Sequence, residues 1–215
     1  KTDKLECSYA VCNEKRIESL AIQHGLIKKN LKYTSLPVSN YLVWSDKFEN
    51  ELSESYAGCK CTPIGCAYFD QHFTSKKNKS DLSDINHCNI IFLPVSGYSQ
   101  TPMTEVVFAF HICLKYIKEH NDCELTIKPH PGGDYELIKK LITENEYPSV
   151  KLLDNDVELD LDRYDIVVTM NSTIGIESAI YRKPIIVILS SMKMLMVADY
   201  INYKIGEFVT SYEEM

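Results

Sequence analysis

The stretch Asp165-Ile-Val-Val-Thr-Met-Asn-Ser-Thr-Ile-Gly-Ile-Glu177 decides the fold class of this chain. Its β-branched first half is typical of a buried strand, and its second half opens with the helix-capping types Asn171, Ser172 and Thr173. At the start of a helix, unpaired backbone N–H groups and the positive end of the helix dipole favour an anion. The stretch therefore predicts a strand that leads into a helix, with a phosphate-binding site at the junction.

Apolar segments of the same kind recur on both sides of this junction. From residue 88 onward they alternate with amphipathic stretches, which is the rhythm of βαβ units. The pattern predicts strands at 88–94, 123–128, 149–153, 165–169, 184–189 and, more weakly, 207–210. It predicts helices at 102–120, 134–144 and 172–181. Strands that are buried on both faces read as continuous apolar segments, so we expect an α/β domain with a doubly wound, Rossmann-like parallel sheet over 88–215.

The part of the chain before this domain carries fewer periodic segments. Short strands are expected at 19–23, 41–44 and 62–65, with a helix at 46–56. The polar stretch 71–87 is the expected linker, so residues 1–87 are interpreted as a partial N-terminal α/β portion plus linker. The chain begins without Met and ends in what reads like the start of a helix. We therefore expect a fragment of a longer protein.

Composition and charge limit the classes of partner. The 215 residues carry a formal net charge of -7, with 30 acidic against 23 basic side chains, which argues against a nucleic-acid-binding surface. No apolar run approaches the roughly 18 to 20 residues of a membrane span, and no signal peptide is recognised at the N-terminus. We expect a soluble, cytoplasmic protein, and a peripheral association with the inner face of a membrane or with a capsule-assembly complex stays open.

The eight cysteines allow two further interpretations, a disulfide framework or a zinc site. Cys88, Cys113 and Cys123 fall in apolar stretches, where cysteine usually behaves as a small buried hydrophobe. The cluster formed by Cys59, Cys61 and Cys66 lacks a second spaced pair or a nearby histidine pair. We predict free thiols and no metal site.

The expected sheet order brings three distant loops together. In the common doubly wound order 3-2-1-4-5-6, the first and fourth strands are neighbours at the topological switch, and the second strand lies beside the first. The carboxyl ends of these strands carry polar or flexible residues, namely Ser96 and Gly97, Lys128 and His130, and Ser172 and Thr173. We therefore predict one ligand crevice lined by the three loops.

His130 lies between two prolines in Lys128-Pro-His-Pro-Gly-Gly133. The prolines fix the backbone around the imidazole, and the glycines permit close backbone approach. The ring could donate a hydrogen bond to a phosphate oxygen or carry a proton; the alternative is a loop histidine bonded to a backbone carbonyl. Glu177, one turn into the helix, is a candidate for the ribose hydroxyls, or else an acid that complements the helix dipole.

His24 is the candidate base in the N-terminal part. It follows a predicted strand and precedes Gly25, where the chain takes on loop character. A histidine at such a strand end can face a ligand bound at the other domain. A structural histidine is the alternative.

These segments together resemble the GT-B superfamily. Gln23-His-Gly25, Tyr41-Leu-Val-Trp-Ser-Asp46, Lys128-Pro-His-Pro131, Asn171-Ser-Thr-Ile-Gly-Ile-Glu177 and Lys183-Pro-Ile-Ile-Val187 are similar to segments of bacterial capsule and surface-polysaccharide enzymes. The similar members are polysialyltransferase-like, Kdo-transferase-like and CDP-glycerol glycerophosphotransferase-like. The resemblance covers 88–210 and 17–70, while the Asp/Glu-Asp-Gly motif of the polysialyltransferases is absent from the sequence.

The resemblance implies a metal-independent glycosyltransferase that needs no cofactor and moves a sugar from a CMP-, CDP- or UDP-linked donor to an oligosaccharide or lipid-linked glycan. His130, Ser172 and Thr173 would contact the donor phosphate, with Ser96, Gly97 and Lys128 nearby. Glu177 would face the ribose, and His24 would be the catalytic base. A sugar-nucleotide epimerase, a CDP-polyol phosphotransferase and a non-catalytic nucleotide-binding fragment are the alternatives.

Overall fold

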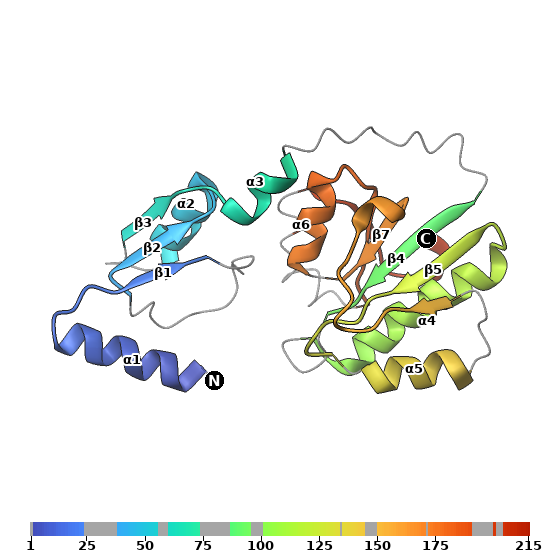
Figure 1. Cartoon of the computed structure of the whole chain (residues 1–215), viewed down its shortest axis with the longest axis horizontal. Helices are drawn as coiled ribbons and strands as arrows, with labels where there is room; N and C mark the ends of the chain where they lie inside the picture. The colour runs from blue at the N-terminus through green and yellow to red at the C-terminus, as the bar shows by residue number, and fades with distance from the viewer. Residues whose placement is uncertain are drawn as a thin grey trace. The chain divides into compact units, whose positions relative to one another are not determined.

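A computed structural model describes residues 2–23, 38–55, 60–73, 87–95, 101–133, 135–144, 150–170, 172–190, 200 and 204–215. The chain divides into two compact units, residues 1–71 and 72–215 (Figure 1). Residues 74–86, which hold most of the predicted linker, lie outside the described residues. The boundary at residue 87 therefore stays a prediction.

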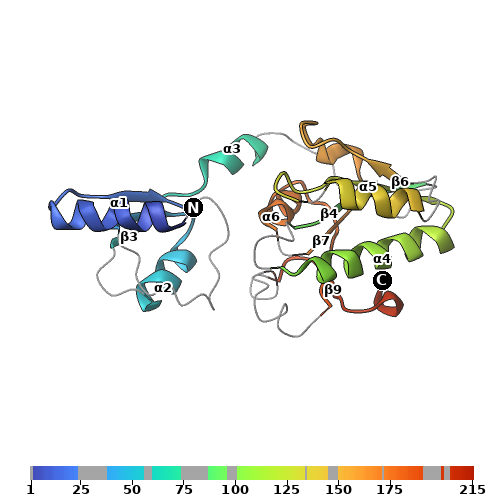
Figure 2. The same cartoon turned by 90° about the horizontal axis from the view of Figure 1, so that it is seen from below.

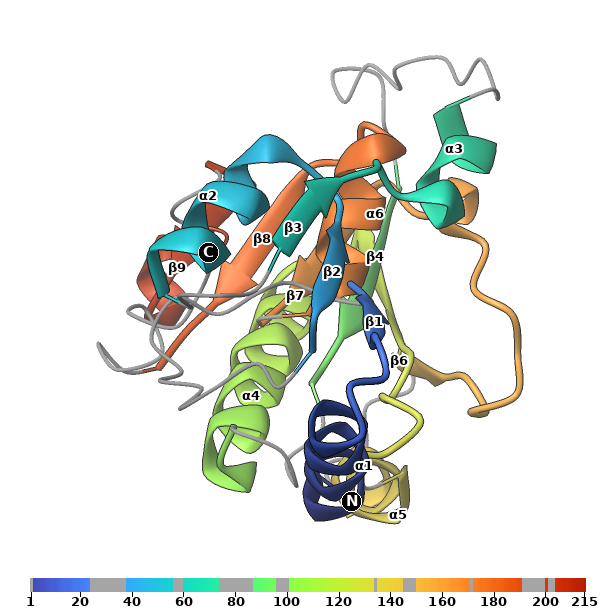
Figure 3. The ribbon, with the colours of Figure 1, turned by 90° about the vertical axis from the view of Figure 1, so that its left-hand side faces the viewer.

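The first unit contains a three-stranded parallel sheet in the order β1-β2-β3 (Figure 3). The strands are β1 (Leu20–Ile22), β2 (Asn40–Val43) and β3 (Lys60–Pro63), and the helices are α1 (Thr2–Glu14), α2 (Asp46–Ser55) and α3 (Ala67–Phe73). The three predicted strands and the predicted helix are present, with β3 two residues earlier than expected. The sequence pattern missed α1 and α3, and the end of α3 occupies the first three residues of the predicted linker.

The second unit contains a six-stranded, all-parallel sheet in the order β6-β5-β4-β7-β8-β9. Its strands are β4 (Cys88–Leu93), β5 (Cys123–Ile127), β6 (Val150–Leu152), β7 (Ile166–Thr169), β8 (Ile185–Ile188) and β9 (Glu207–Val209). Numbered along the chain, these strands follow the order 3-2-1-4-5-6. The doubly wound prediction is confirmed.

Helices cover both faces of this sheet. On one face, α4 (Met103–Glu119) and α5 (Tyr135–Glu144) lie side by side (Figure 2) and pack on the core that includes Ile90, Phe92, Leu125 and Ile127. On the other face, α6 (Thr173–Ile180) and the short helix η2 (Leu161–Arg163) cover Ile91, Leu93 and Val167. A second short helix, η3 (Tyr212–Glu214), contacts α4 near the C-terminus. Within the described residues, no helix is long and apolar enough to cross a membrane.

Candidate functional site

The candidate site lies at the carboxyl edge of the second sheet, where β4 is flanked by β5 and β7. The backbone N–H of Lys128 donates to the Phe92 carbonyl at 3.1 Å, so the loop after β5 leaves directly beside the end of β4. On the other side of β4, the Thr169 hydroxyl donates to the Leu93 carbonyl at 3.0 Å. Two strand spacings separate β5 from β7, or ~10 Å. The loops that carry His130 and Ser172 therefore flank one strand end, as the sequence predicted.

A tight turn fixes the imidazole of His130. The Gly132 N–H donates to His130 Nδ1 at 3.0 Å, and the Gly133 N–H donates to the His130 carbonyl at 2.6 Å. Because Nδ1 accepts a hydrogen bond, the proton of the neutral ring is on Nε2. His130 is exposed, so Nε2–H is available as a donor.

Glycine at position 133 suits this turn, because a side chain there would crowd the backbone of the turn. A Cβ at this position would lie 3.0 Å from the His130 carbonyl oxygen. The close approach that the glycines permit is thus an approach to the turn's own backbone, and not only to a ligand as the sequence suggested.

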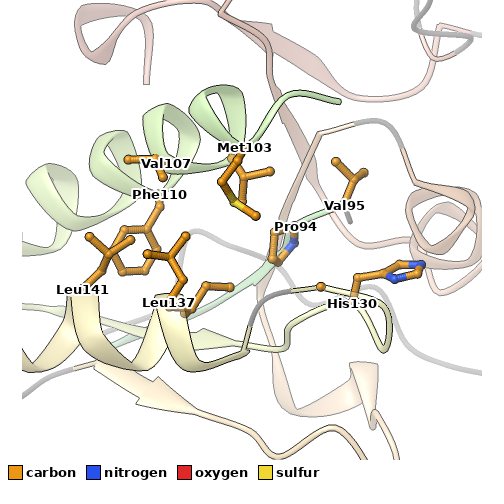
Figure 4. A pocket seen from close by; sticks show the side chains of 11 residues that line it. Pro94, Val95, Met103, Val107, Phe110, His130, Leu137 and Leu141 are labelled. Carbon is orange, nitrogen blue, oxygen red and sulfur yellow. The ribbon is translucent and has the colours of Figure 1, made fainter. Parts of the chain in front are cut away.

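Apolar side chains support the same turn from behind. A hollow between α4 and α5 is lined almost wholly by carbon, from Pro94, Val95, Met103, Val106, Val107, Phe110, Leu137, Ile138 and Leu141, with His130 and Gly133 at one side. Figure 4 shows the ring of His130 directed away from these side chains. An anion needs hydrogen-bond donors, so this hollow is packing behind the turn and not the anion site itself.

Lys128 is held by the neighbouring loop. Its Nζ donates to the backbone carbonyls of Asp154 and, at 2.8 Å, of Asn155. Tyr135 donates from its hydroxyl to Asp154 Oδ1 at 2.7 Å, and this hydrogen bond raises the pKa of Tyr135. Lys128 thus ties the loop after β6 to the end of β5, and Tyr135 ties it to the start of α5. The role of Lys128 as a direct phosphate ligand stays a prediction.

Helix α6 begins with Ser172 as its N-cap, in extended backbone geometry. Within the described residues, the Ser172 side chain makes no capping hydrogen bond. The first turn of α6 contains no acidic residue to compete with a bound anion. Ser172 and Thr173 are both half-buried. The ordinary capping role therefore does not account for the Ser172 hydroxyl.

Glu177 is the fifth residue of α6 and is half-buried. Favourable interactions between acids and the helix dipole are confined to the first turn. The dipole-complementing interpretation of Glu177 is thereby weakened, and its role toward a ribose stays a prediction.

Three predicted site residues, His24, Ser96 and Gly97, lie outside the described residues, as does Asn171. The structure brings together the loops of His130 and Ser172. Sequence reasoning missed Tyr135, Asp154 and Tyr200. A glycine inside a helix, Gly175, was the one available signal for Tyr200, because the aromatic ring lies against it.

Among the side chains that the structure describes, six cysteines are free thiols: Cys12, Cys61, Cys66, Cys88, Cys113 and Cys123. Burial, followed by the nearby Cys123 and Asp165, raises the pKa of Cys88 to about 12. Burial also raises the pKa of Cys113. Among the residues that the structure describes, no cluster of three metal-binding side chains occurs.

These environments predict selective alkylation. In native protein at pH 8, iodoacetamide should modify the half-buried Cys12 and Cys66 well before Cys88 and Cys113, because the thiolate is the nucleophile. Unfolding should remove the difference. Mass spectrometry of timed samples measures the order in which the cysteines are alkylated; rapid alkylation of Cys113 in the native protein would contradict the prediction.

The pKa of Cys88 also affects stability. Since folding raises the pKa of Cys88, its neutral thiol favours the folded state below about pH 9, and this contribution is lost as the pH rises toward 12.

Residues 100–191 match the family described as capsule polysaccharide biosynthesis protein. This segment runs from the start of α4 to just past β8 and includes both His130 and Ser172. None of the curated proteins matches the chain.

Solved structures that resemble the chain share its fold across both units. An M. jannaschii UDP-GlcNAc 2-epimerase in complex with UDP-GlcNAc and UDP has a TM-score of 0.66 at 13% identity, covering 96% of this chain and 62% of that one. S. aureus MnaA with UDP has a TM-score of 0.64 at 14% identity, covering 96% and 59%. The chain has a GT-B-like fold.

A third structure, TarM, has a TM-score of 0.51 at 14% identity, covering 92% of this chain and 41% of TarM. The GT-B-like chain thus spans at most about three fifths of the length of these structures. It resembles the GT-B enzymes of capsule and surface polysaccharides, as the sequence predicted. The two parallel sheets correspond to the two Rossmann-like portions expected of that superfamily.

Proposed function

We propose that this GT-B-like chain belongs to a metal-independent glycosyltransferase that uses a nucleotide-activated sugar in surface-polysaccharide synthesis. The observation that carries the proposal is the pair of donor-bearing loops, with His130 and Ser172, on either side of the β4 end within the segment that matches the capsule family. The UDP present in two structures of the same fold favours a nucleotide as the ligand.

The chemistry begins with the leaving nucleotide. As the bond between the sugar and the phosphate oxygen breaks, negative charge develops on that oxygen. Nε2–H of His130 and the hydroxyls of Ser172 and Thr173 would donate to it, and the first turn of α6 would add free N–H groups and its dipole. Because these donors are held in place before the reaction, they stabilise the charge without a metal ion.

The acceptor reacts in the second half of the proposed mechanism. An acceptor hydroxyl would attack the anomeric carbon and form the new glycosidic bond, while His24 removes the hydroxyl proton. Glu177 would bind the ribose hydroxyls, and Ser96, Gly97 and Lys128 would lie around the phosphates. The acceptor is an oligosaccharide or a lipid-linked glycan, in keeping with the capsule-family match.

A second candidate is a sugar-nucleotide epimerase. Its support is that one of the most similar folds bears the name UDP-GlcNAc 2-epimerase, with a TM-score of 0.66. An epimerase would bind the same class of donor but would isomerise the sugar without an acceptor.

Calorimetric titration with UDP, CDP and CMP tests the shared part of both candidates. We expect one nucleotide to bind at least about ten-fold more tightly than the other two, since a base-reading site discriminates by hydrogen bonds that the wrong base leaves unmade. Absence of binding by all three would defeat the proposal.

Product analysis then separates the two candidates. The matching nucleotide sugar is incubated with the protein, with and without a glycan acceptor. A transferase releases nucleotide and extends the acceptor, whereas an isomerised sugar in the absence of acceptor would identify an epimerase.

A further inference from the structure

Tyr200 is the largest fully buried side chain of the described residues, with 0% of its surface exposed. Its hydroxyl donates to the carbonyl of Ser172, the N-cap residue of α6. The same carbonyl accepts the Gly175 N–H at 3.1 Å, the first intrahelical bond of this turn. A residue 28 positions away thus holds the backbone at which the helix begins.

The ring of Tyr200 also lies against Gly175, in the first turn of α6. A Cβ at this position would lie 2.6 Å from the ring carbons Cε1 and Cζ of Tyr200. Glycine inside a helix is less favourable than alanine by roughly 0.5 to 1 kcal/mol. Its presence in the first turn of α6 is explained by the ring that fills the space where a side chain would be.

We propose that Tyr200 is a positioning residue for the donor phosphate: its buried phenol sets the first turn of α6 so that Ser172 and Thr173 face the anion. The inference rests on the proposed function and goes beyond it, because Tyr200 itself does not touch the substrate. Its hydroxyl is occupied by the Ser172 carbonyl, on the backbone side of the turn.

Removing only the hydroxyl leaves the fold in place but frees the turn. In Tyr200→Phe the Ser172 carbonyl still accepts the Gly175 N–H, and the ring still fills its site. The turn can then shift, and small misplacements of groups that contact a charged ligand are costly. We expect the affinity for the preferred nucleotide among UDP, CDP and CMP to fall at least about five-fold, while the affinity for its nucleoside changes less than about two-fold.

Tyr164→Phe is the matched control. Tyr164 is also a buried tyrosine of the second unit, but it precedes β7 at the opposite, amino edge of the sheet. Removing its hydroxyl can lower the melting temperature, yet it should not alter the ratio of nucleotide to nucleoside affinity. Equal losses of nucleotide and nucleoside affinity in Tyr200→Phe would show a merely structural role and overturn the proposal.

Amide NMR on the ligand-free protein provides a readout that does not depend on nucleotide binding. In Tyr200→Phe, but not in Tyr164→Phe, the amide signals of Thr173 and Ile174 should move, and the Gly175 amide, which donates to the Ser172 carbonyl, should exchange faster with solvent. Unchanged amides overturn the positioning role alone. If wild-type protein binds none of the three nucleotides, the proposed function fails and the donor-site role of Tyr200 falls with it, while the amides still report whether Tyr200 holds the turn.

Gly175→Ala is the second variant. Against wild-type Tyr200, its methyl group must displace the ring, so both the melting temperature and nucleotide affinity should fall. In a Tyr200→Ala background the methyl group has room, and the same change should leave the melting temperature unchanged or raise it. A higher melting temperature for Gly175→Ala alone would contradict the contact on which the proposal rests.

Discussion

His130→Ala is expected to lower turnover roughly 100- to 1000-fold while leaving the fold intact. Loss of one preorganised donor to a developing oxyanion typically costs about 2.7 to 4 kcal/mol of barrier. The loss of stability should be small, because His130 is exposed and the Gly132 N–H, which donates to His130 Nδ1, can form a hydrogen bond with water instead. Steady-state kinetics with the preferred nucleotide sugar, together with thermal unfolding, measure the two effects separately.

The tautomer of His130 allows a sharper version of this experiment. In His130→Gln, the side-chain amide can place an N–H near the position of Nε2, so part of the activity should return if the residue acts as a donor. In His130→Asn, the shorter side chain can still accept from Gly132 but does not reach as far, so turnover should stay as low as in His130→Ala. If His130 instead carries a proton, Gln should be as inactive as Ala, because an amide does not titrate.

His111→Ala is the control for the loss of an imidazole. His111 is an exposed histidine on α4 that has no part in the candidate site. Its turnover should match that of wild-type protein. Near-normal turnover in His130→Ala would remove His130 from the catalytic assignment.

The strand order of the second unit could be predicted because its signal is local. Each strand is a short apolar run, and the crossover helix α4 repeats apolar residues with a 3.6-residue period on its buried side, including Val106, Phe110 and Ile117. Topology then placed His130 and Ser172 around one strand end, although they are 42 positions apart in sequence. The first unit was harder, because α3 has only seven residues and shows less than two full periods.

The contacts that shape the site could not be predicted, because they join segments whose proximity exists only in the folded chain. The sequence shows Lys128 as a cation near a glycine-rich turn, which favours a phosphate ligand, whereas the fold gives its Nζ two backbone carbonyls. The sequence likewise shows Gly175 as an unfavourable helix residue, and only the ring of Tyr200 explains it. Backbone carbonyls carry no sequence signature, since every residue has one.

Ser172→Ala is expected to weaken nucleotide binding by about 10- to 100-fold with almost no loss of stability. A hydrogen bond to a charged group contributes about 1.5 to 3 kcal/mol, which corresponds to that range. An ordinary N-cap serine behaves in the opposite way, since its replacement by alanine costs about 1 kcal/mol of stability. Ser172 differs because its side chain makes no capping hydrogen bond among the described residues. Calorimetry and thermal unfolding of the same preparation give both quantities.

Asp160→Ala, in the same unit, is the control for which we expect the reverse result. Asp160 is the N-cap of η2, and its Oδ1 does accept the Asp162 N–H at 3.1 Å. Its replacement should therefore lower the melting temperature and leave nucleotide affinity unchanged. If Ser172→Ala instead loses stability as Asp160→Ala does and keeps its affinity, the hydroxyl is a cap that the ligand-free geometry does not reveal. The opposite pattern in the two variants would assign the Ser172 hydroxyl to the ligand, because a hydroxyl that caps the helix stabilises the free protein, whereas one that donates to a phosphate stabilises only the complex.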